Sequence, residues 1–275
     1  HEKVGRFESV PVDRGHGGVG LVLGADIDLR IFLRHWRYGF AVAKATKDGE
    51  RNSLQFFDES GTAVHKVFLK PESETGAYKA LVNDFAAPAP APLEIAPVPE
   101  RRAPRPDAEI DVAALRAAWL ALEDTHDFVP MLMKQKVQRV QALRLAGKDL
   151  AAPVAASSLR QTLEWAAASG ADIMVFVGNR GCIQIHTGPV KNLRAMGPWF
   201  NVLDPGFNLH LREDRIASAW VVRKPTADGV ITSLELFDAE DEMIATLFGK
   251  RKPGEAERGD WRGFAESLAV PGARA

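Results

Sequence analysis

Short runs of alternating apolar and polar residues occur in two parts of the chain. A period of two residues is typical of strands that bury one face of a sheet. The runs cover residues 40–44, 53–57 and 63–68 in the first part, and residues 217–223, 231–237 and 243–248 in the second. Asp48-Gly49 and Asp228-Gly229 stand between the first two runs of each part, and Asp-Gly suits a tight hairpin turn. The pattern therefore predicts two antiparallel meanders.

Apolar residues spaced three or four positions apart predict helices, most of them ahead of the second meander. Residues 111–122 place Val112, Leu115, Trp119 and Leu122 on one face, with Asp111 as the N-cap. Further helices are predicted at residues 137–145 and 157–168, strands at 173–177 and 181–186, and a short helix after each meander, at 78–85 and 261–268. Because the first meander has no counterpart of the three preceding helices, the two parts are not expected to be equivalent.

The two meanders are copies of one another. The segment SLQFFDESGTAVHKVF from Ser53 aligns without a gap with SLELFDAEDEMIATLF from Ser233, at a spacing of 180 residues. The same shift aligns Phe40 with Trp220, and LRIFL from Leu29 with LHLRE from Leu209. Agreement in one frame over about 50 residues indicates an internal repeat. We therefore predict an α+β fold with a tandem structural duplication, in which two antiparallel β-sheets are stacked with flanking helices.

A proline-rich stretch separates the copies. Residues 86–107 contain seven prolines, and most of the others are alanine or charged. Proline removes backbone donors and favours extended geometry, which predicts an exposed linker; an ordered loop that crosses the surface is the alternative. The predicted domains are residues 1–86 as the first repeat, 87–107 as the Pro/Ala-rich linker and 108–275 as the second repeat. Since the first repeat lacks the three helices, we expect it to be incomplete on its N-terminal side.

Composition narrows the function classes. The 35 basic residues are balanced by 36 acidic ones, whereas a protein that binds nucleic acid non-specifically usually has a basic excess. The longest apolar runs, such as residues 173–177, are far too short to cross a bilayer, so stable membrane insertion is not expected. Cys182 is the single cysteine, which rules out an intramolecular disulfide and fits a reducing, cytoplasmic compartment.

The histidines are the first candidates for chemistry, because the sequence has no Walker loop, His-Glu-x-x-His helix or Gly-x-Ser-x-Gly elbow. His65, His186 and His210 fall in strand patterns, His35 stands among bulky basic residues, and His16 lies in the glycine-rich segment 15–20, which is predicted as a loop. Such positions are typical of structural or surface histidines. His126 differs, because it lies between an amphipathic helix and Pro130, where a helix is expected to end. A histidine at such a junction is the best candidate for a ligand.

Two arginines stand out as well. Arg30 interrupts an otherwise apolar strand pattern, and Arg251 follows directly after a strand. A buried arginine needs an anionic partner. A large flat ligand with acid groups would use aromatic walls for its ring and cations for its carboxylates. An ordinary surface cation or an internal ion pair is the alternative at both positions.

These residues carry a resemblance to a known family. The chain resembles the cytoplasmic haemin-transport and haemin-degrading proteins of the HemS/HmuS/ChuS type, in the stretches 24–42, 124–128, 173–181, 220–224, 232–237 and 248–254. The resemblance implies that His126 is the axial ligand of the haem iron and that Arg30 is a catalytic arginine on the opposite face. It also implies that Phe176, Phe248 and Arg251 line the haem pocket. Phe248 stands where relatives carry tyrosine, so no hydroxyl donor is expected there.

The resemblance further implies a haem-binding protein of bacterial haem uptake and iron acquisition, whose ligand is iron protoporphyrin IX. Because only the second repeat has the helices that present His126, we predict one haem per chain. Two hypotheses share this site. The first is a carrier that receives haem from an importer at its cytoplasmic face and passes it to a separate haem oxygenase. The second is an enzyme that degrades haem with an external reductant. A third hypothesis, of another class, is a duplicated interaction module that binds no haem.

Overall fold

The computed structural model describes residues 1–5, 12–13, 18–47, 49–88, 92–252 and 254–269. His16 and Asp48, which were named above, lie outside the described residues. Val19 and Gly20 were predicted to belong to a loop, but they begin a strand.

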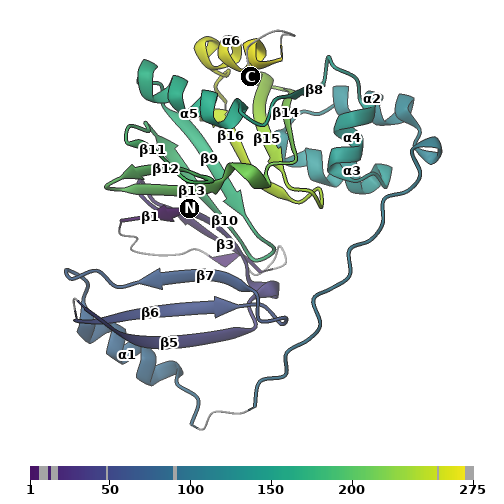
Figure 1. The fold of residues 1–275 in the computed structure, drawn as a ribbon. Helices are drawn as coiled ribbons and strands as arrows, with labels where there is room; N and C mark the ends of the chain where they lie inside the picture. The colour runs from purple at the N-terminus through teal and green to yellow at the C-terminus, as the bar shows by residue number, and fades with distance from the viewer. Residues whose placement is uncertain (6–11, 14–17, 48, 89–91, 253, 270–275) are drawn as a thin grey trace.

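All strand pairs in the described ranges are antiparallel, and they form three sheets (Figure 1). The strand orders are β2-β3-β4-β10-β9-β16-β15-β14-β8, β1-β13-β12-β11 and β5-β6-β7. The strands are β1 Glu2–Lys3, β2 Val12–Asp13, β3 Val19–Leu23, β4 Asp28–Phe32, β5 Tyr38–Thr46, β6 Gly49–Phe57, β7 Ala63–Phe68, β8 Ala151–Val154, β9 Ile173–Gly178, β10 Cys182–Gly188, β11 Leu193–Met196, β12 Trp199–Asp204, β13 Phe207–Arg212, β14 Ser218–Thr226, β15 Gly229–Phe237 and β16 Met243–Gly249.

Helices flank these sheets, which confirms the predicted α+β class. The α-helices are α1 Thr75–Phe85, α2 Val112–Leu120, α3 Phe128–Gln135, α4 Arg139–Leu145, α5 Ser158–Ser169 and α6 Gly259–Leu268, and the 3-10 helices are η1 Leu33–His35, η2 Asp107–Glu109, η3 Thr125–Asp127 and η4 Glu213–Arg215. Within the described residues, no helix combines the length and the apolar character that a membrane span requires.

The predicted duplication is present in three dimensions. β5, β6 and η1 recur 180 residues later as β14, β15 and η4. A shift of register occurs at the same place in both copies, between Phe56 and Phe57 in β6 and between Leu236 and Phe237 in β15. A β-bulge is a specific local feature, so its recurrence supports a common origin of the two meanders.

The copies exchange strands, which the sequence did not predict. β1 and β10 hold the same place in the order of their copies. β10 pairs with β4 of the first copy, with Ile183 opposite Arg30, and β1 pairs with β13 of the second copy, with Glu2 opposite Asn208. Each copy therefore contributes a strand to a sheet of the other copy. Two stacked sheets were predicted, whereas the described residues form three, because β5, β6 and β7 make a sheet of their own.

The predicted stacking of sheets is confirmed by a shared core. One cluster of buried residues joins the nine-stranded sheet, the four-stranded sheet, α5 and α6. Its largest members include Phe200, Phe207, Leu234, Leu247 and Trp261. Successive side chains along β14 and β15 point to opposite faces of the sheet. Trp220, Val222 and Phe237 therefore point away from the first cluster and belong to a second one, under α2, α3 and α4. The nine-stranded sheet is thus covered on both faces at its β14–β15 end.

The helix α3 was not predicted, because Pro130 was taken as the end of a helix. Pro130 is the third residue of α3, in the first turn. Backbone N–H groups of the first turn have no partner within the helix, so proline is tolerated there. The predicted helices at 111–122, 137–145 and 157–168 correspond to α2, α4 and α5.

Between residue 86 and η2, the described part of the linker has neither helix nor strand, and most of its residues are exposed. It is attached in its middle and toward its C-terminal end. The Ala96 N–H donates to the Glu59 carbonyl at 2.9 Å, and the Gln138 side chain donates to the Arg102 carbonyl at 2.5 Å. The linker therefore runs along the outside from the three-stranded sheet to the helices α2–α4 (Figure 1).

Candidate functional site

One face of the nine-stranded sheet collects several predicted site residues. In antiparallel pairs, residues opposite each other point to the same side of the sheet. The register forms the row Asp28, Ile185, Phe176, Thr246, Glu235 and Trp220. Arg30 follows Asp28 by two residues and points to the same face. Because α2–α4 cover Trp220, this face has a helix-covered part over β14 and β15 and a less covered part over β16, β9, β10 and β4.

Two predicted aromatic residues meet on the less covered part. Phe176 in β9 and Phe248 in β16 have ring centroids 5.3 Å apart and pack edge to face, and both are half-buried. Phe248 stands opposite Met174, so a second apolar side chain extends the same surface. This arrangement provides an apolar surface against which a flat ligand can pack.

We call the helices α2, α3 and α4 the helical layer. His126 lies on η3, at the edge of this layer. Its side chain is 87% exposed. Asp124 is the N-cap of η3: its Oδ1 accepts the His126 N–H at 2.8 Å and lies 2.6 Å from the ring Nδ1. These hydrogen bonds from His126 hold the pKa of Asp124 below its usual value, so the carboxylate is an acceptor.

The contact with Asp124 favours one tautomer of the His126 imidazole. In the neutral imidazole, an acceptor at Nδ1 places the ring proton there and leaves Nε2 with a free lone pair, which is the form that binds a metal. In the structure, the carboxylate of Asp124 is the group that holds the ring.

Both predicted arginines are ion-paired. Arg30 donates to Asp28 on the same face of β4 and to the Leu29 carbonyl at 3.3 Å. Arg251, beyond the end of β16, pairs with Asp228 at the β14–β15 turn and donates to the Glu255 carbonyl at 3.3 Å. Both arginines thus have the ion pair that the sequence left open as an alternative, and Arg30 also shares the sheet face with Phe176.

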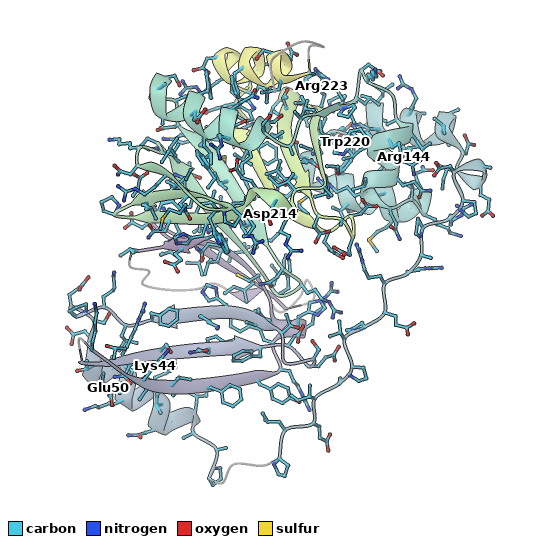
Figure 2. All side chains as sticks on the ribbon, viewed as in Figure 1. Lys44, Glu50, Arg144, Asp214, Trp220 and Arg223 are labelled. Carbon is cyan, nitrogen blue, oxygen red and sulfur yellow. The ribbon has the colours of Figure 1, made fainter. Side chains whose placement is uncertain are left out.

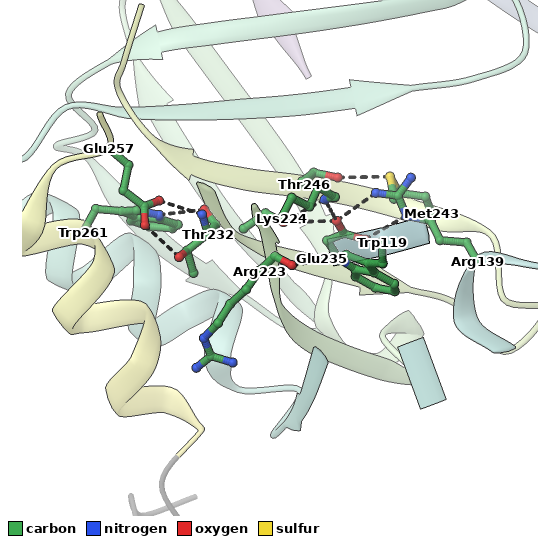
Figure 3. A network of polar contacts seen from close by, with 11 residues as sticks. Trp119, Arg139, Arg223, Lys224, Thr232, Glu235, Met243, Thr246, Glu257 and Trp261 are labelled. Carbon is green, nitrogen blue, oxygen red and sulfur yellow. Dashed lines mark hydrogen bonds and ion pairs between the residues drawn. The ribbon is translucent and has the colours of Figure 1, made fainter. Parts of the chain in front are cut away.

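Three charged residues of the site region were missed by sequence reasoning. Glu235 of β15 is fully buried, and its carboxylate accepts two hydrogen bonds of 2.8 Å from Arg139 and one of 2.7 Å from Lys224 (Figure 3). Burial by itself raises the pKa of Glu235, but the charges of Arg139 and Lys224 outweigh it and hold the pKa well below its usual range. One feature of the sequence could have indicated them: Lys224 and Glu235 are charged residues at inward-facing positions of two strand patterns that are otherwise largely apolar.

Three of the other histidines pack against or are hydrogen-bonded to neighbouring side chains, or are shielded from water. His186 is buried and stacked on Phe207 at 3.8 Å, and burial together with the charge of Lys3 lowers its pKa to about 4. His65 also has a lowered pKa because it is buried, and His210 lies 2.8 Å from the amide oxygen of Asn201. Burial raises the pKa of Cys182 to about 12, so its thiol stays protonated. Among the described residues, no three histidine, cysteine, aspartate or glutamate side chains are grouped so that they could bind a bare metal ion.

A cavity of about 460 Å³ lies away from the predicted site, at the end of β13. Trp199, His210, Arg212 and Asp214 are among its lining residues, and none of the predicted site residues lines it. Two of its charged side chains, Arg212 and Asp214, form an ion pair with each other. We therefore locate the candidate site by residue chemistry on the sheet face, not by this cavity.

Comparisons with known proteins identify the family. The model of the haemin-degrading HemS.ChuX domain matches residues 1–85 and 136–268, and His126 lies between these two segments. The chain is 41% identical over 262 residues to the hemin transport protein HmuS of Yersinia pestis, which covers 95% of this chain and 75% of that protein. The hemin transport protein HemS of Yersinia enterocolitica is 40% identical over 263 residues, with the same coverage.

Solved structures agree with this result. Holo-PhuS, a heme-binding protein from Pseudomonas aeruginosa, is similar with a TM-score of 0.89 and 50% identity, over 96% of this chain and 76% of that one. The heme degrading enzyme ChuS of Escherichia coli O157:H7 has a TM-score of 0.89 and 41% identity, over 98% of this chain and 77% of that one. The chain belongs to the haemin-degrading HemS.ChuX domain family.

Proposed function

We propose that this chain is a bacterial haem-binding protein that receives imported haem in the cytoplasm and passes it on, as part of iron acquisition. The observation that carries the proposal is the imidazole of His126, whose Nδ1 is held by Asp124 and whose exposed Nε2 is free to bind iron. Membership of the family and the names of the relatives, two hemin transport proteins and a heme-binding protein, support it. These relatives lend no support to an interaction module without haem.

Each predicted residue has a role in this proposal. His126 binds the iron, and Asp124 keeps the imidazole in the required tautomer. The porphyrin packs on Phe176 and Phe248, and Arg30 lies toward the opposite face of the haem. Arg251 binds a haem carboxylate, which requires its ion pair with Asp228 to open. The bound haem supplies the redox chemistry of iron, while the protein orients it and controls access to it.

We further propose one haem per chain and a division into residues 1–86, 87–107 and 108–275. The helices that carry and flank His126 occur in the second copy, and the described part of the first copy has no counterpart of them. A titration should therefore show a single break at one equivalent of haem, and a break at two equivalents would contradict this stoichiometry.

The first experiment is a haem titration followed by the Soret absorbance of the wild type, His126→Ala and His210→Ala. His210 is the matched control, because it is also exposed and has a side-chain hydrogen-bond partner. We expect saturable binding by the wild type and His210→Ala, and weaker binding or a shifted Soret band for His126→Ala. If the wild type does not bind haem, the proposal fails. If His126→Ala has an unchanged spectrum, another residue binds the iron.

Haem degradation is the second candidate function. It is favoured by Arg30, a polar group on the same sheet face as the aromatic surface, and by the similarity to the heme degrading enzyme ChuS. Two measurements separate a carrier from an enzyme. Anaerobic release of bound haem to a haem oxygenase supports the carrier, and conversion to a ring-opened tetrapyrrole by an added reductant, in the presence of catalase, supports the enzyme.

A further inference from the structure

An aromatic ring is one of the contacts that anchor the segment carrying His126 to the sheet. Phe128 is the first residue of α3, two positions after His126, and it is fully buried. The edge of its ring meets Trp119 of α2, with centroids 4.6 Å apart. Trp119 in turn donates its indole N–H to the Arg223 carbonyl of β14 at 2.9 Å. Through Phe128, the position of His126 depends on what holds this ring.

Two cations hold the ring of Phe128. The Arg139 guanidinium lies 4.9 Å from the ring centroid, and the Lys224 ammonium lies 4.7 Å from it. Cations at such distances are attracted by the electron-rich face of an aromatic ring, most strongly where water is excluded. Both cations are bonded to the buried carboxylate of Glu235, so one anion sets the place of both (Figure 3). We call Glu235, Arg139, Lys224 and the ring of Phe128 the Glu235 cluster.

Stability alone does not account for the Glu235 cluster. Removing charges from water costs free energy, and apolar side chains of similar volume often serve a core equally well. The best-attested use of a buried ionic group is to specify one arrangement among several. Here the arrangement is the docking of α3, and therefore of η3, on the strands β14 and β15.

The duplication provides an internal comparison. At the spacing of 180 residues, Lys224 corresponds to Lys44, and Glu235 corresponds to Gln55. Lys44 is exposed on the three-stranded sheet, away from the helical layer (Figure 2). The lysine thus occurs in both copies, whereas the acid occurs where a helical layer covers the strands. Glu235 therefore occurs in the copy whose strands are covered by the helices next to His126, and the corresponding strand of the other copy has no acidic residue at this position.

We propose that the Glu235 cluster positions His126 for iron binding: it holds Phe128, which fixes the start of α3 and the direction in which His126 offers Nε2. Asp124 sets the rotation of the imidazole ring, and the Glu235 cluster sets the place of the segment. Glu235 and Phe128 are positioning residues in this scheme. The inference rests on the proposed function, in which His126 is the iron ligand.

The test compares Glu235→Gln and Phe128→Leu with Glu257→Gln. Glu257 is a matched control, because it is also buried and paired with an arginine, Arg262, but it lies under α6. For each variant we measure the stability in urea, the spin state of ferric haem by electron paramagnetic resonance, and the rate of haem release to apomyoglobin. Glu235→Asp is the conservative variant that tests for rescue.

We expect Glu235→Gln and Phe128→Leu to bind haem with an altered spin-state mixture and at least about five-fold faster release, with partial recovery in Glu235→Asp. Glu257→Gln should lose stability but keep the wild-type spectrum and release rate.

A wild-type spectrum and release rate in both cluster variants would overturn the inference, as would an equal change in Glu257→Gln. If the wild type itself binds no haem, the proposed function fails instead, so the two failures are distinguishable. Phe128→Leu keeps the test open if Glu235→Gln does not fold.

Discussion

At the scale of single residues, the site depends on polar groups that fix the state of their neighbours. The Asp124 carboxylate accepts hydrogen bonds from both the backbone and the ring of His126. Arg30 has Asp28 as its anionic partner, and Phe248 has no hydroxyl with which to add a further hydrogen bond. Among the residues proposed to meet the haem, His126 and Arg30 each have a neighbouring carboxylate that restricts the side chain.

We expect Asp124→Ala to weaken haem binding about 10- to 100-fold, because the imidazole loses the partner that sets its tautomer and orientation. The same change removes an N-cap, so a control for capping is needed. Asp111→Ala is suitable, since Asp111 caps α2 by accepting the Ala114 N–H at 2.9 Å and lies outside the site. A Soret titration should show wild-type affinity for Asp111→Ala. Equal weakening in both variants would mean that capping alone matters.

His186 makes the stability dependent on pH. Its pKa is about 4 in the folded protein and about 6.5 in an unfolded chain, so the unfolded state takes up the proton first as the pH falls. The stability from this residue is complete above pH 6.5 and is lost between pH 6.5 and 4, by about 2 kcal/mol between pH 7 and pH 5. Urea unfolding at both pH values should show this loss in the wild type and a smaller loss in His186→Phe. An equal loss in the variant would assign the pH dependence to other groups.

At the scale of elements, the helical layer α2–α4, together with η3, is the part of the second copy that carries the proposed iron ligand. It rests on β14 and β15 through an apolar cluster that includes Trp119, Phe128, Trp220 and Phe237. Trp119 combines full burial with a hydrogen bond to the Arg223 carbonyl. It joins α2 to the sheet and packs on the ring that begins α3, so it links the whole layer to the strands.

Trp119→Ala should lower the free energy of unfolding by about 3–5 kcal/mol, because it removes a large buried side chain. Trp119→Phe retains most of the volume but leaves the Arg223 carbonyl without its donor, and should cost about 1–2 kcal/mol. Urea unfolding measures both values, and haem titration should show the larger loss of binding for Trp119→Ala. Trp165→Ala is the control, because Trp165 stacks on Phe264 of α6, away from this layer. Loss of haem binding in Trp165→Ala would contradict a specific role for the helical layer.

At the scale of the whole molecule, the exchange of strands joins the two copies. β10 lies in one sheet with β4, and β1 lies in one sheet with β13. Further hydrogen bonds connect the three-stranded sheet to the rest: Trp36 donates to the Gly181 carbonyl and Asn179 donates to the Val64 carbonyl, both at 2.8 Å. The linker is therefore a covalent connection between parts that are already held together.

Cleavage of the linker should leave the two fragments associated. Arg101 and Arg102 are exposed in an extended segment, so limited trypsin digestion is expected to cut there. The fragments should elute together from a gel-filtration column in buffer, and should separate in denaturant. Separation in buffer would mean that the paired strands contribute little to holding the copies together.

Several features could be predicted from the sequence because they depend on near neighbours. The strands of both meanders, the helices around Trp119 and Leu143, and the extended linker follow from periodicity and proline content, and the duplication follows from one shift of 180 residues. His126 was singled out by its place at the end of a helix, although α3 was missed because a proline was not recognised in a first turn. The roles assigned to the site residues stay predictions until haem binding is measured.

By itself, the sequence determined the two meanders, five of the helices, the repetition and the candidate ligand, because backbone propensity and alternation act over a few residues. Only the tertiary structure decided which strands pair and which faces meet. Arg30 and Phe176 share a surface because β10 lies between β4 and β9, and no local pattern specifies that order. Arg139 and Glu235 are 96 residues apart and meet because α4 packs over β15. Contacts at such separations arise from burial of the whole chain, which fixes the register and the docking of helices together.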